Sequence, residues 1–580
     1  MDMHDDRTNG GNGRMLVFGG TTEGRKAVEV LEEAGTTYYY STKTVEQDVA
    51  MRHGLRIVGA LDGEAMRAFC REHGIRLIVD AAHPFAAQLH HTVAAVSEEL
   101  NIPAVRYERI YPPRDASIIW IDDYSQIPAD IRSLLATTGV QSIGRLKYLE
   151  ERGVRVVYRI LNRESSIRLA HEQGATDDQL CFYPQTVEAE AVLMKESGES
   201  GGFIEKIAEA RTKGMRIIVL KRPELSFAHT VNGPYGLRRA VEKLLPEFYP
   251  LHSGLTTGTC ATAAAVAEAL RRWKGEMPHE VPVVLPDGET ITVAVGYGDG
   301  YAYCIKEAGD DPDVTNGLEI RAQVEPSDSF VIHGGEGVGR FTLPGFDYPP
   351  GEAAINKAPR EMMRHNLKEN VKITISVPDG REVARKTFNP RLGIEGGISI
   401  IGVSGIVKPF SEEAFIDSIR KCMQVAKASG ADRVVINSGG KSERYMKARY
   451  PMLPQQAFVE YGNYIGETLK IGHELGFKNV TLGVMLGKAV KLAAGNLDTH
   501  SKKTVMDKTF IASMLEEADC PIDLTNLTLA RELWERIPKE KTEDFCRVVI
   551  HHCLQFCEPI VPQAALTLLL IDDDGTIHSL

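Results

Sequence analysis

The stretch from 252 to 265, HSGLTTGTCATAAA, runs from a loop rich in glycine and threonine into an alanine-rich segment. Its glycines permit tight backbone turns, and Thr257 or Thr259 is a natural N-cap for a following helix. A helix start presents N–H groups and a partial positive charge, which together attract an anion. The same pattern suits a capped helix that packs tightly into a core, and local features alone leave the two interpretations balanced.

The bulk composition is that of an ordinary globular protein. The chain has 580 residues, of which 43% are hydrophobic and 25% charged, enough for about four compact units of ~150 residues. A formal net charge of −12 argues against nucleic acid and anionic membrane as partners. A polycarboxylate substrate would therefore need local clusters of arginine and lysine.

Targeting and metal signals are weak. Residues 1–13 are polar and glycine-rich and predict a disordered tail, and no apolar run reaches the ~18 residues that span a bilayer. Nine scattered cysteines indicate reduced thiols and a cytoplasmic protein. FCRVVIHHCLQFC at 545–557 suits a buried helix face better than a metal site, and the aspartates at 310–313 suit a turn, so no metal is expected.

The first glycine loop follows a predicted strand. RMLVF at 14–18 leads into GGTTEG at 19–24 and then a helix from about 25 to 34. This order places a pyrophosphate on a helix N-terminus, although the motif is not G-x-G-x-x-G. The strand at 38–40 ends in Ser41 and Lys43 without an acidic residue, which suits the 2′-phosphate of NADPH or an ordinary polar strand end. The predicted dinucleotide contacts are Gly19, Gly20, Thr21, Thr22, Glu23, Gly24, Ser41 and Lys43.

Two further segments extend this region. The strand at 76–80 leads into AAHPFA at 81–86, at the carboxyl end where open α/β sheets bind ligands. His83 is the candidate catalytic proton donor, or a hydrogen-bond donor to a substrate carboxylate, with a structural turn histidine as the alternative. A second α/β subdomain starts near 137 and contains a glycine-serine loop at 195–206 before a helix.

These segments (18–24, 80–86, 195–206 and 221–223) resemble the precorrin-6A reductase family over about residues 14–246. Ala82 stands where that family is expected to have threonine. The resemblance implies NADPH or NADH as the hydride donor, and substrate contacts at Lys195 and Ser197.

A second resemblance starts from the loop at 252–265. The blocks EAGDDPDVT (307–315), GVGR (337–340), GEAAIN (351–356), NPRLGI (389–394) and KAVKLAAG (488–495) follow it. Together they resemble the cobalt-precorrin-5B C1-methyltransferase family, with Leu255 in place of an aromatic residue and Met485 near an expected histidine. The resemblance implies S-adenosylmethionine and a cobalt-precorrin tetrapyrrole. The predicted substrate contacts are Thr256, Thr257, Thr259, Arg340, Arg360, Arg391, Lys488 and His500.

Strand-to-glycine junctions follow the predicted strands at 398–401, 433–436 and 480–485. Small residues at the carboxyl edge of a doubly wound sheet let S-adenosylmethionine lie against backbone. The predicted contacts are Gly402, Ser404, Gly405, Asn437, Ser438 and Gly439. NSGGKS at 437–442 is not a P-loop, because the first glycine of that motif would fall at Val435.

The predicted fold is α/β. A Rossmann-like doubly wound reductase module (14–246, with subdomains at about 14–136 and 137–246) is followed by a connector at 247–252. A two-part α+β and α/β methyltransferase module then occupies 253–580, with two strands around the PDG turn at 286–288.

The predicted function is bifunctional: C1 methylation of cobalt-precorrin-5B, then NAD(P)H-dependent reduction of cobalt-precorrin-6A to cobalt-precorrin-6B. In the alternative, only the methyltransferase half is active and the first half is a dinucleotide-binding regulatory module. A scaffold for other enzymes of the pathway is a third possibility, and oligomerisation stays open.

Overall fold

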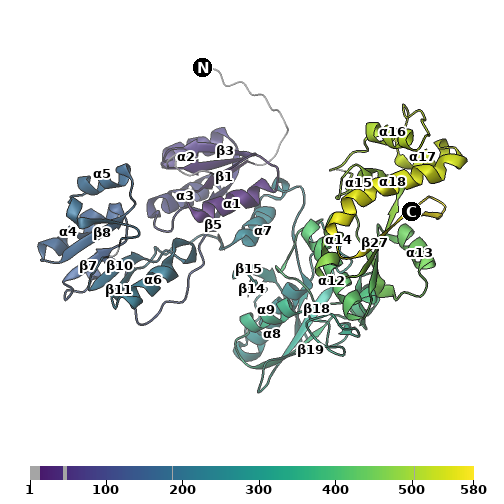
Figure 1. Ribbon diagram of the computed structural model, residues 1–580. Coiled ribbons are helices and arrows are strands. Elements are labelled where there is room, and N and C mark those ends of the chain that lie inside the picture. The colour runs from purple at the N-terminus through teal and green to yellow at the C-terminus, as the bar shows by residue number, and fades with distance from the viewer. Residues whose placement is uncertain (1–13, 44–48, 186, 502) are drawn as a thin grey trace. The chain divides into compact units, whose positions relative to one another are not determined.

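The computed structural model describes residues 14–43, 49–185, 187–501 and 503–580. The chain divides into two compact units (Figure 1). The first unit extends to Ser253 and also takes in Pro282–Thr292, whereas the second consists of Gly254–Val281 and Val293–Leu580. Within the described ranges, no helix is both long and apolar enough to cross a membrane.

The first sheet of the first unit is parallel throughout, in the order β12-β5-β4-β1-β2-β3. Alternate residues of each strand face opposite sides, so both faces are apolar and carry helices. One face packs against α1 and α7, and the other against α2 and α3. The elements are β1 (Arg14–Phe18), α1 (Thr22–Glu32), β2 (Tyr38–Thr42), β3 (Gly54–Val58), α2 (Gly63–Glu72), β4 (Ile75–Asp80), α3 (Ala87–Leu100), β5 (Ala104–Tyr107), β12 (His229–Val231) and α7 (Pro234–Leu244).

A second parallel sheet has the order β6-β11-β10-β7-β8-β9. Its elements are β6 (Ile119–Ile121), β7 (Ser133–Ala136), α4 (Ile143–Glu151), β8 (Arg155–Ile160), α5 (Glu164–Glu172), β9 (Leu180–Phe182), β10 (Ala191–Lys195), α6 (Phe203–Thr212) and β11 (Arg216–Leu220). The division therefore differs from the expected boundary near residue 137. The second sheet already includes β6 and β7, and the chain later returns to the first sheet, where β12 pairs with β5 and α7 buries Leu237 and Val241.

The segment expected to be a connector, residues 247–252, lies wholly within the first unit. Phe248 and Tyr249 are buried in the core around α1 and α7. The Tyr249 hydroxyl donates to the Val30 carbonyl at 2.9 Å, and Thr36 Oγ1 donates to the carbonyl of Phe248 at 2.7 Å. These residues are packed structure and not a free spacer.

The second unit has two parts, as expected. The first part is a five-stranded sheet, β16-β17-β18-β21-β19, antiparallel except for β19 and β21, with α8 packed against β17, β18 and α9. Its elements are α8 (Thr257–Lys274), β16 (Gly296–Gly298), β17 (Tyr301–Ile305), β18 (Glu319–Pro326), β19 (Val331–Gly334), α9 (Lys357–Asn366) and β21 (Val371–Ser376). The α+β prediction for this part is confirmed.

The second part is a sheet in the order β25-β24-β26-β27-β28, parallel except for β28. Its elements are α12 (Glu412–Ala428), β24 (Arg433–Asn437), α13 (Gly440–Arg449), β25 (Phe458–Glu460), α14 (Ile465–Glu474), β26 (Asn479–Met485), α15 (Leu486–Ala493), α16 (Lys508–Glu517), α18 (Thr542–Cys557), β27 (Ala565–Ile571) and β28 (Ile577–His578). The α/β prediction is confirmed here as well.

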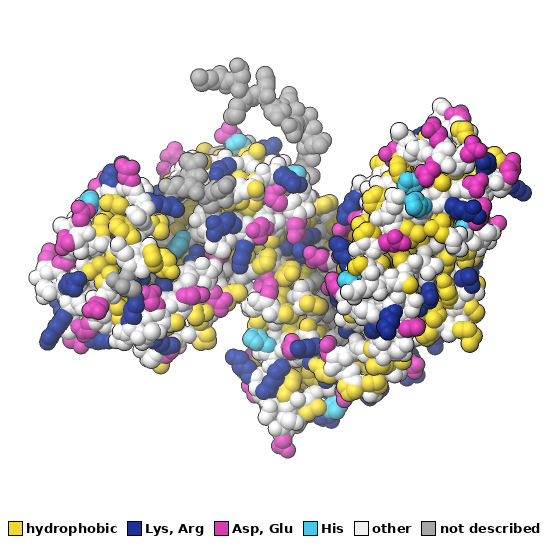
Figure 2. Space-filling model, viewed as in Figure 1, with side chains coloured by type: hydrophobic (Ala, Val, Ile, Leu, Met, Phe, Trp, Pro, Cys, Tyr) yellow, Lys and Arg dark blue, Asp and Glu magenta, His cyan; other side chains and the backbone are white. Residues whose placement is uncertain are grey.

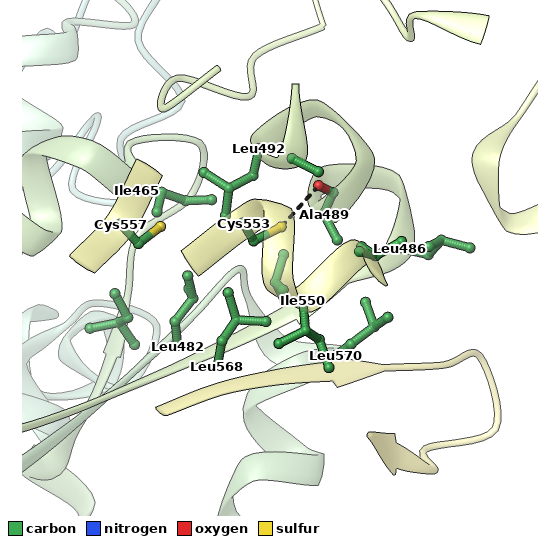
Figure 3. Close-up of a cluster of buried hydrophobic side chains, with 14 of the residues drawn as sticks. Ile465, Leu482, Leu486, Ala489, Leu492, Ile550, Cys553, Cys557, Leu568 and Leu570 are labelled. Atoms are coloured by element: carbon green, nitrogen blue, oxygen red, sulfur yellow. Dashed lines mark hydrogen bonds between the residues drawn. The ribbon is translucent and has the colours of Figure 1, made fainter. Parts of the chain in front are cut away.

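The cysteine-containing segment at 545–557 lies within α18. Cys553 and Cys557 are fully buried among Leu482, Leu492 and Leu568 (Figure 3), and the Cys553 thiol donates to the Ala489 carbonyl at 3.3 Å. Burial raises the pKa of Cys557 to about 12. In the part of the chain that the structure describes, no group of three or more His, Cys, Asp or Glu side chains is arranged to hold a metal.

Candidate functional sites

The glycine loop after β1 lies at the carboxyl edge of the first sheet. Gly20 has a φ of +88°, and a Cβ added there would meet no atom within 4 Å. The Thr21 hydroxyl accepts from Gly24 N at 2.9 Å as the N-cap of α1 and donates to the Ala81 carbonyl at 2.7 Å. These bonds fix the loop between the ends of β1 and β4, which is the point where the strand order reverses and open α/β sheets bind ligands.

Three of the predicted dinucleotide contacts differ in their exposure. Parallel pairing sets Phe18 opposite Ser41, so the end of β2 lies beside the glycine loop, and Gly19 N donates to the Ser41 carbonyl at 2.9 Å. Ser41 is buried and Lys43 is exposed. Thr22 is partly buried and accepts from Arg25 at 3.3 Å. Lys43 is therefore the member of the set that reaches solvent with a positive charge.

The His83 turn follows β4 and rests on a buried ionic network. The Asp80 carboxylate is 2.5 Å from His90 Nδ1 and 3.0 Å from Arg106 Nη1, and all three side chains are buried. His90 Nε2 lies 3.0 Å from the carbonyl of His83. Burial would raise the pKa of Asp80, but the bond to His90 and the Arg106 charge outweigh it and the pKa is lowered.

His83 itself is exposed at the sheet edge, and its Nδ1 accepts from Phe85 N at 3.2 Å. Although the side chain reaches solvent, the nearby protein atoms desolvate the ring, and this effect, followed by the charges of Arg109 and Lys195, lowers the pKa of His83 to about 4. The ring is therefore neutral at pH 7. With Nδ1 as an acceptor, the proton of the neutral ring is on Nε2, which suits hydrogen-bond donation better than proton transfer.

Arg109 joins the glycine loop to the second sheet. Its guanidinium contacts the Glu23 carboxylate at 2.8 Å and donates to the Ser197 carbonyl at 2.7 Å, and both charged groups are buried. Ser200 also donates to Glu23. Burial would raise the pKa of Glu23, but the Ser200 bond and the Arg109 charge lower it. A buried ion pair thus holds the start of α1 against the loop after β10.

Lys195 and Ser197 occupy that same loop. The Lys195 ammonium lies 5.0 Å from the centre of the Phe85 ring, and burial lowers its pKa. Ser197 is buried and its hydroxyl donates to the Gly201 carbonyl at 3.2 Å. The structure therefore brings Lys195 to the His83 turn, whereas the Ser197 hydroxyl is used within its own loop.

A cavity of about 470 Å³ opens beside this junction, lined from both sheets. The buried Glu196 carboxylate binds Arg114 at 2.9 Å and Arg222 at 2.8 Å, and the Arg222 guanidinium stacks over Tyr111 at 3.8 Å. Arg106 also lines the cavity. Glu108, Glu196 and Glu224 line the cavity as well, and each of the three arginines already contacts one of the first two carboxylates.

In the second unit, the threonines at the start of α8 are all buried and bonded to protein. Thr259 Oγ1 donates to the Gly405 carbonyl at 2.6 Å, and Thr257 Oγ1 accepts from Ile401 N at 2.8 Å. Gly258 N donates to the Ile401 carbonyl at 2.9 Å. This helix start therefore binds the 401–405 loop through the groups that an anion would need.

The 401–405 loop lies directly on these threonines. A Cβ at Gly402 would lie 2.2 Å from Thr256 Oγ1, so the close approach requires glycine. Ser404 Oγ donates to the Ile406 carbonyl at 3.0 Å. Ile401 and Val403 are 49% and 77% exposed, so the loop presents an apolar surface to solvent while its backbone is held by α8.

The other predicted S-adenosylmethionine contacts follow β24. The buried Asn437 donates to the Val459 carbonyl at 3.2 Å and accepts from Gly439 N at 3.2 Å. Ser438 N donates to Ser442 Oγ at 3.0 Å. Gly439 has a φ of +145°, and a Cβ added there would lie 3.3 Å from the Glu460 carboxylate. These bonds shape a turn of small residues at the carboxyl edge of the β25-β24-β26-β27-β28 sheet.

Glu460, Lys488 and Arg391 surround that turn. Arg391 lies 2.8 Å from Glu443 and 3.9 Å from Glu460, and Lys488 donates to the Gly462 carbonyl. Burial, partly offset by Glu460, lowers the pKa of Lys488 to about 8. The two predicted carboxylate-binding cations are therefore already paired with protein oxygens beside the candidate cofactor edge.

The remaining predicted cations lie elsewhere in the unit. Arg340 is exposed and donates to the Gly351 carbonyl at 2.9 Å. Arg360 donates to the Ile355 carbonyl at 2.8 Å and stacks over Tyr348 at 4.3 Å. His500 is partly buried, and its backbone N–H donates to Asp498 at 3.1 Å. Arg340 and Arg360 are connected through their shared neighbour, the 351–355 segment.

A cationic groove runs along α9 and includes Arg360. Its volume is about 640 Å³, and its lining residues are Phe330, Ile332, Arg360, Glu361, Arg364, His365 and Lys368. The Arg364 guanidinium stacks over Phe330 at 4.7 Å. Figure 2 shows Lys and Arg side chains gathered beside a histidine over the region of α8 and α9. An apolar floor with a cationic rim suits a flat ligand that carries acid groups.

Sequence reasoning did not single out Arg106, Arg109, Glu196 or Arg364. Arg109 lies just after β5, at the same sheet edge as the glycine loop, so a rule that collects charged residues at all parallel strand ends would have found it. Arg364 lies one turn after Arg360 on α9, and helical spacing would have found it.

Two family models match different parts of the chain. Residues 246–409 match the family described as CbiD, and residues 14–237 match the family described as precorrin-6x reductase CbiJ/CobK. A cobalt-precorrin-5B C(1)-methyltransferase of Prosthecochloris aestuarii is 41% identical over 352 residues, which is 56% of this chain and 95% of the relative. One of Geobacillus kaustophilus is 45% identical over 284 residues, which is 46% of this chain and 76% of that relative.

Two solved structures are also similar. The cobalamin biosynthesis protein cbiD of Archaeoglobus fulgidus is 31% identical, with a TM-score of 0.26, covering 44% of this chain and 83% of that one. A structure described as CobK precorrin-6A reductase is 18% identical, with a TM-score of 0.33, and the match covers 40% of this chain and 96% of that one.

Proposed function

From the premise that this chain belongs to the cobalt-precorrin-5B C(1)-methyltransferase family and carries a CbiJ/CobK reductase domain at residues 14–237, we propose two consecutive activities. The second unit methylates C1 of cobalt-precorrin-5B, with S-adenosylmethionine as the methyl donor. The first unit reduces the product, cobalt-precorrin-6A, to cobalt-precorrin-6B, with NADPH or NADH as the hydride donor.

The observation that carries the reductase proposal is the meeting of two sheet edges at Arg109. The open space at Gly20 fits a phosphate group, which needs close backbone approach at a helix start. Lys43, at the end of the neighbouring strand, supplies a cation that suits a 2′-phosphate. Arg109 neutralises Glu23, which would otherwise repel a pyrophosphate at the start of α1.

The residues around His83 would orient the tetrapyrrole. The Asp80 network fixes the His83 turn, and a neutral ring donates a hydrogen bond from Nε2 to a substrate carboxylate or carbonyl. Lys195 adds a positive charge on the opposite loop. The arginines of the 470 Å³ cavity would bind further carboxylates by exchanging their present partners, Glu108 and Glu196.

For methyl transfer, we propose that the turn at Asn437–Gly439 and the 401–405 loop hold S-adenosylmethionine. Glu460 beside Gly439 offers a carboxylate acceptor for hydroxyl or amino groups. The threonines of α8 act by fixing the 401–405 backbone. The chain needs no side-chain nucleophile, because methyl transfer from a sulfonium depends mainly on alignment of the reacting atoms.

We propose that the α9 groove holds acid side chains of the tetrapyrrole. Arg340 and Arg360 were implied by the family resemblance, and the groove adds Arg364, His365 and Lys368 on the same surface. An acidic protein that binds a polyacid needs such a local concentration of cations. Arg391 and Lys488 serve the cofactor edge in this assignment.

The test is incubation of the purified chain with cobalt-precorrin-5B and S-adenosylmethionine, with and without NADPH or NADH, followed by mass spectrometry. We expect a gain of one methyl group without NAD(P)H and a further gain of two hydrogens with it. A methylated product that NAD(P)H never reduces would contradict the reductase proposal and support a regulatory dinucleotide-binding module. No methylation at all would contradict the first activity.

A further inference from the structure

Most of a short hairpin that follows α8 in the sequence belongs to the first unit. Its strands are β14 (Glu280–Val284) and β15 (Thr290–Ala294), around the predicted PDG turn, which is thereby confirmed. Residues 282–292 form part of the first unit, although the chain on both sides belongs to the second. The chain therefore passes between the units at three points.

Glu289 of this hairpin binds the start of α7. Its side chain is 1% exposed, and its carboxylate accepts from Tyr235 N at 3.0 Å and from Gly236 N. Amides in the first turn of a helix have no partner within the helix. The N-cap residue is Gly233, which has no side chain to offer. Glu289 thus supplies the cap that α7 lacks.

The surface on α7 is shaped for this carboxylate. A Cβ at Gly233 would lie 2.3 Å from Glu289, and one at Gly236 would lie 2.9 Å from it. A second bond runs from Thr290 N to Asn232 Oδ1 at 2.8 Å. Any side chain at either glycine would exclude the carboxylate, so the segment at 232–236 is complementary to the hairpin.

The start of α7 matters for the reductase fold. Leu237 and Val241 of α7 are fully buried against Met15 and Val17 of β1, the strand that leads into the glycine loop. Uncapped amides at a buried helix start cost stability, because nothing replaces their bonds to water.

We propose that the 282–292 hairpin is a docking element that caps α7, so that the first unit is complete only when this segment from beyond residue 253 is bound. The inference goes beyond the two proposed activities and does not depend on them. It makes the fusion a structural requirement, since the reductase fold contains a segment encoded beyond the 247–252 connector.

Hydrogen–deuterium exchange on the full chain tests this. In Glu289→Ala, exchange of the Tyr235 and Gly236 amides should rise about tenfold, and protection of β1 should fall. Thr292→Ala, an exposed position on the same hairpin, is the matched control and should leave both unchanged. Peptides of β24 and β26 should keep wild-type protection in both variants.

Two milder variants keep the inference testable if Glu289→Ala unfolds. Glu289→Gln retains one acceptor oxygen and should give an intermediate rise, and Asn232→Ala should expose the Thr290 amide. Unfolding confined to the first unit supports the proposal. Wild-type exchange at 235–236 in Glu289→Ala or in Glu289→Gln overturns it, as does wild-type exchange of the Thr290 amide in Asn232→Ala. No substrate or cofactor is present, so failure here leaves the proposed activities untouched.

Discussion

Two glycine-containing helix starts with similar sequences differ in what occupies them. After β1, Gly20 has a positive φ and open space where its side chain would lie, and the loop faces the Arg109 junction. At the start of α8, the amide of Gly258 and the hydroxyls of the neighbouring threonines bind the 401–405 loop. The first helix start also has bonded amides, since Gly20 N donates to the Tyr40 hydroxyl at 3.2 Å, but it leaves open space beside Gly20. The second helix start is bonded to another loop of the same unit.

The difference teaches that glycine alone does not identify a phosphate site. Both glycines have a positive φ, +138° at Gly402 and +88° at Gly20. They differ in that a side chain at Gly402 would collide with Thr256, whereas Gly20 leaves room beside it. A glycine whose side chain would collide with another part of the protein permits close packing, and a glycine that borders open space permits the approach of a ligand.

The largest expected effect is at the open loop. Gly20→Val places a β-branched residue at a φ of +88°, so we expect NAD(P)H-dependent reduction to fall by about 100-fold or more. Methyl transfer should be unchanged. Both rates are measured on one preparation by mass spectrometry, and an equal loss of both would show that the units are not functionally independent.

The closed loop should respond through stability. Gly402→Ala forces a contact of 2.2 Å with Thr256, and we expect the free energy of unfolding of the second unit to fall by about 1–3 kcal/mol. Gly396→Ala, at a φ of +86° where an added Cβ meets nothing within 4 Å, is the control for the backbone angle and should cost less. Denaturant titration measures the stability of both variants. Equal stability would contradict the claim that close packing of Gly402 on Thr256 stabilises the second unit.

His83 should act without changing its charge. Because its pKa is lowered to about 4, kcat/KM for reduction should show no inflection near the ordinary histidine value between pH 5 and 8. His83→Ala should lower kcat/KM about tenfold, and His83→Gln should retain part of the rate through its N–H donor. An inflection near pH 6.5 that disappears in His83→Ala would instead indicate proton transfer.

The hairpin cap should make the stability of the first unit depend on pH. Burial and Asp287 raise the pKa of Glu289 to about 7 against the opposing effects of the Tyr235 and Gly236 amides and of Lys26, and Tyr107 also lies in its field. A raised pKa means that the folded unit holds the Glu289 proton more tightly than the unfolded chain does. The resulting stability is complete below the pKa that Glu289 has in the unfolded chain, and it is lost as pH rises through about 7. We expect the free energy of unfolding to fall by about 1 kcal/mol from pH 6 to pH 8. Glu289→Gln should remove this dependence.

The smallest expected effect is on the α9 groove. Arg364→Ala removes a surface cation, so the KM for the tetrapyrrole should rise about threefold, with no change in the KM for S-adenosylmethionine. Arg381→Ala, an exposed arginine outside the groove, is the matched control. If only the cofactor KM moves, the groove has been assigned to the wrong ligand.

Local sequence patterns predicted the parallel sheets, the glycine loop after β1 and the hairpin around 286–288, because strand alternation and turn residues act over short distances. They did not predict that β12 returns to the first sheet or that Glu289 caps α7. Those features depend on pairing between residues far apart in the chain. The α8 threonines show the same limit, since only the folded chain reveals that the 401–405 loop takes their hydrogen bonds.

The most direct measurement of the contrast between the two helix starts is hydrogen–deuterium exchange of the full chain with NADPH and, separately, with S-adenosylmethionine. We expect NADPH to protect the amides of 20–25, and S-adenosylmethionine to protect 402–405 and 437–440 while 257–259 stay unchanged. New protection at 257–259 with S-adenosylmethionine, or none at 20–25 with NADPH, would contradict the account.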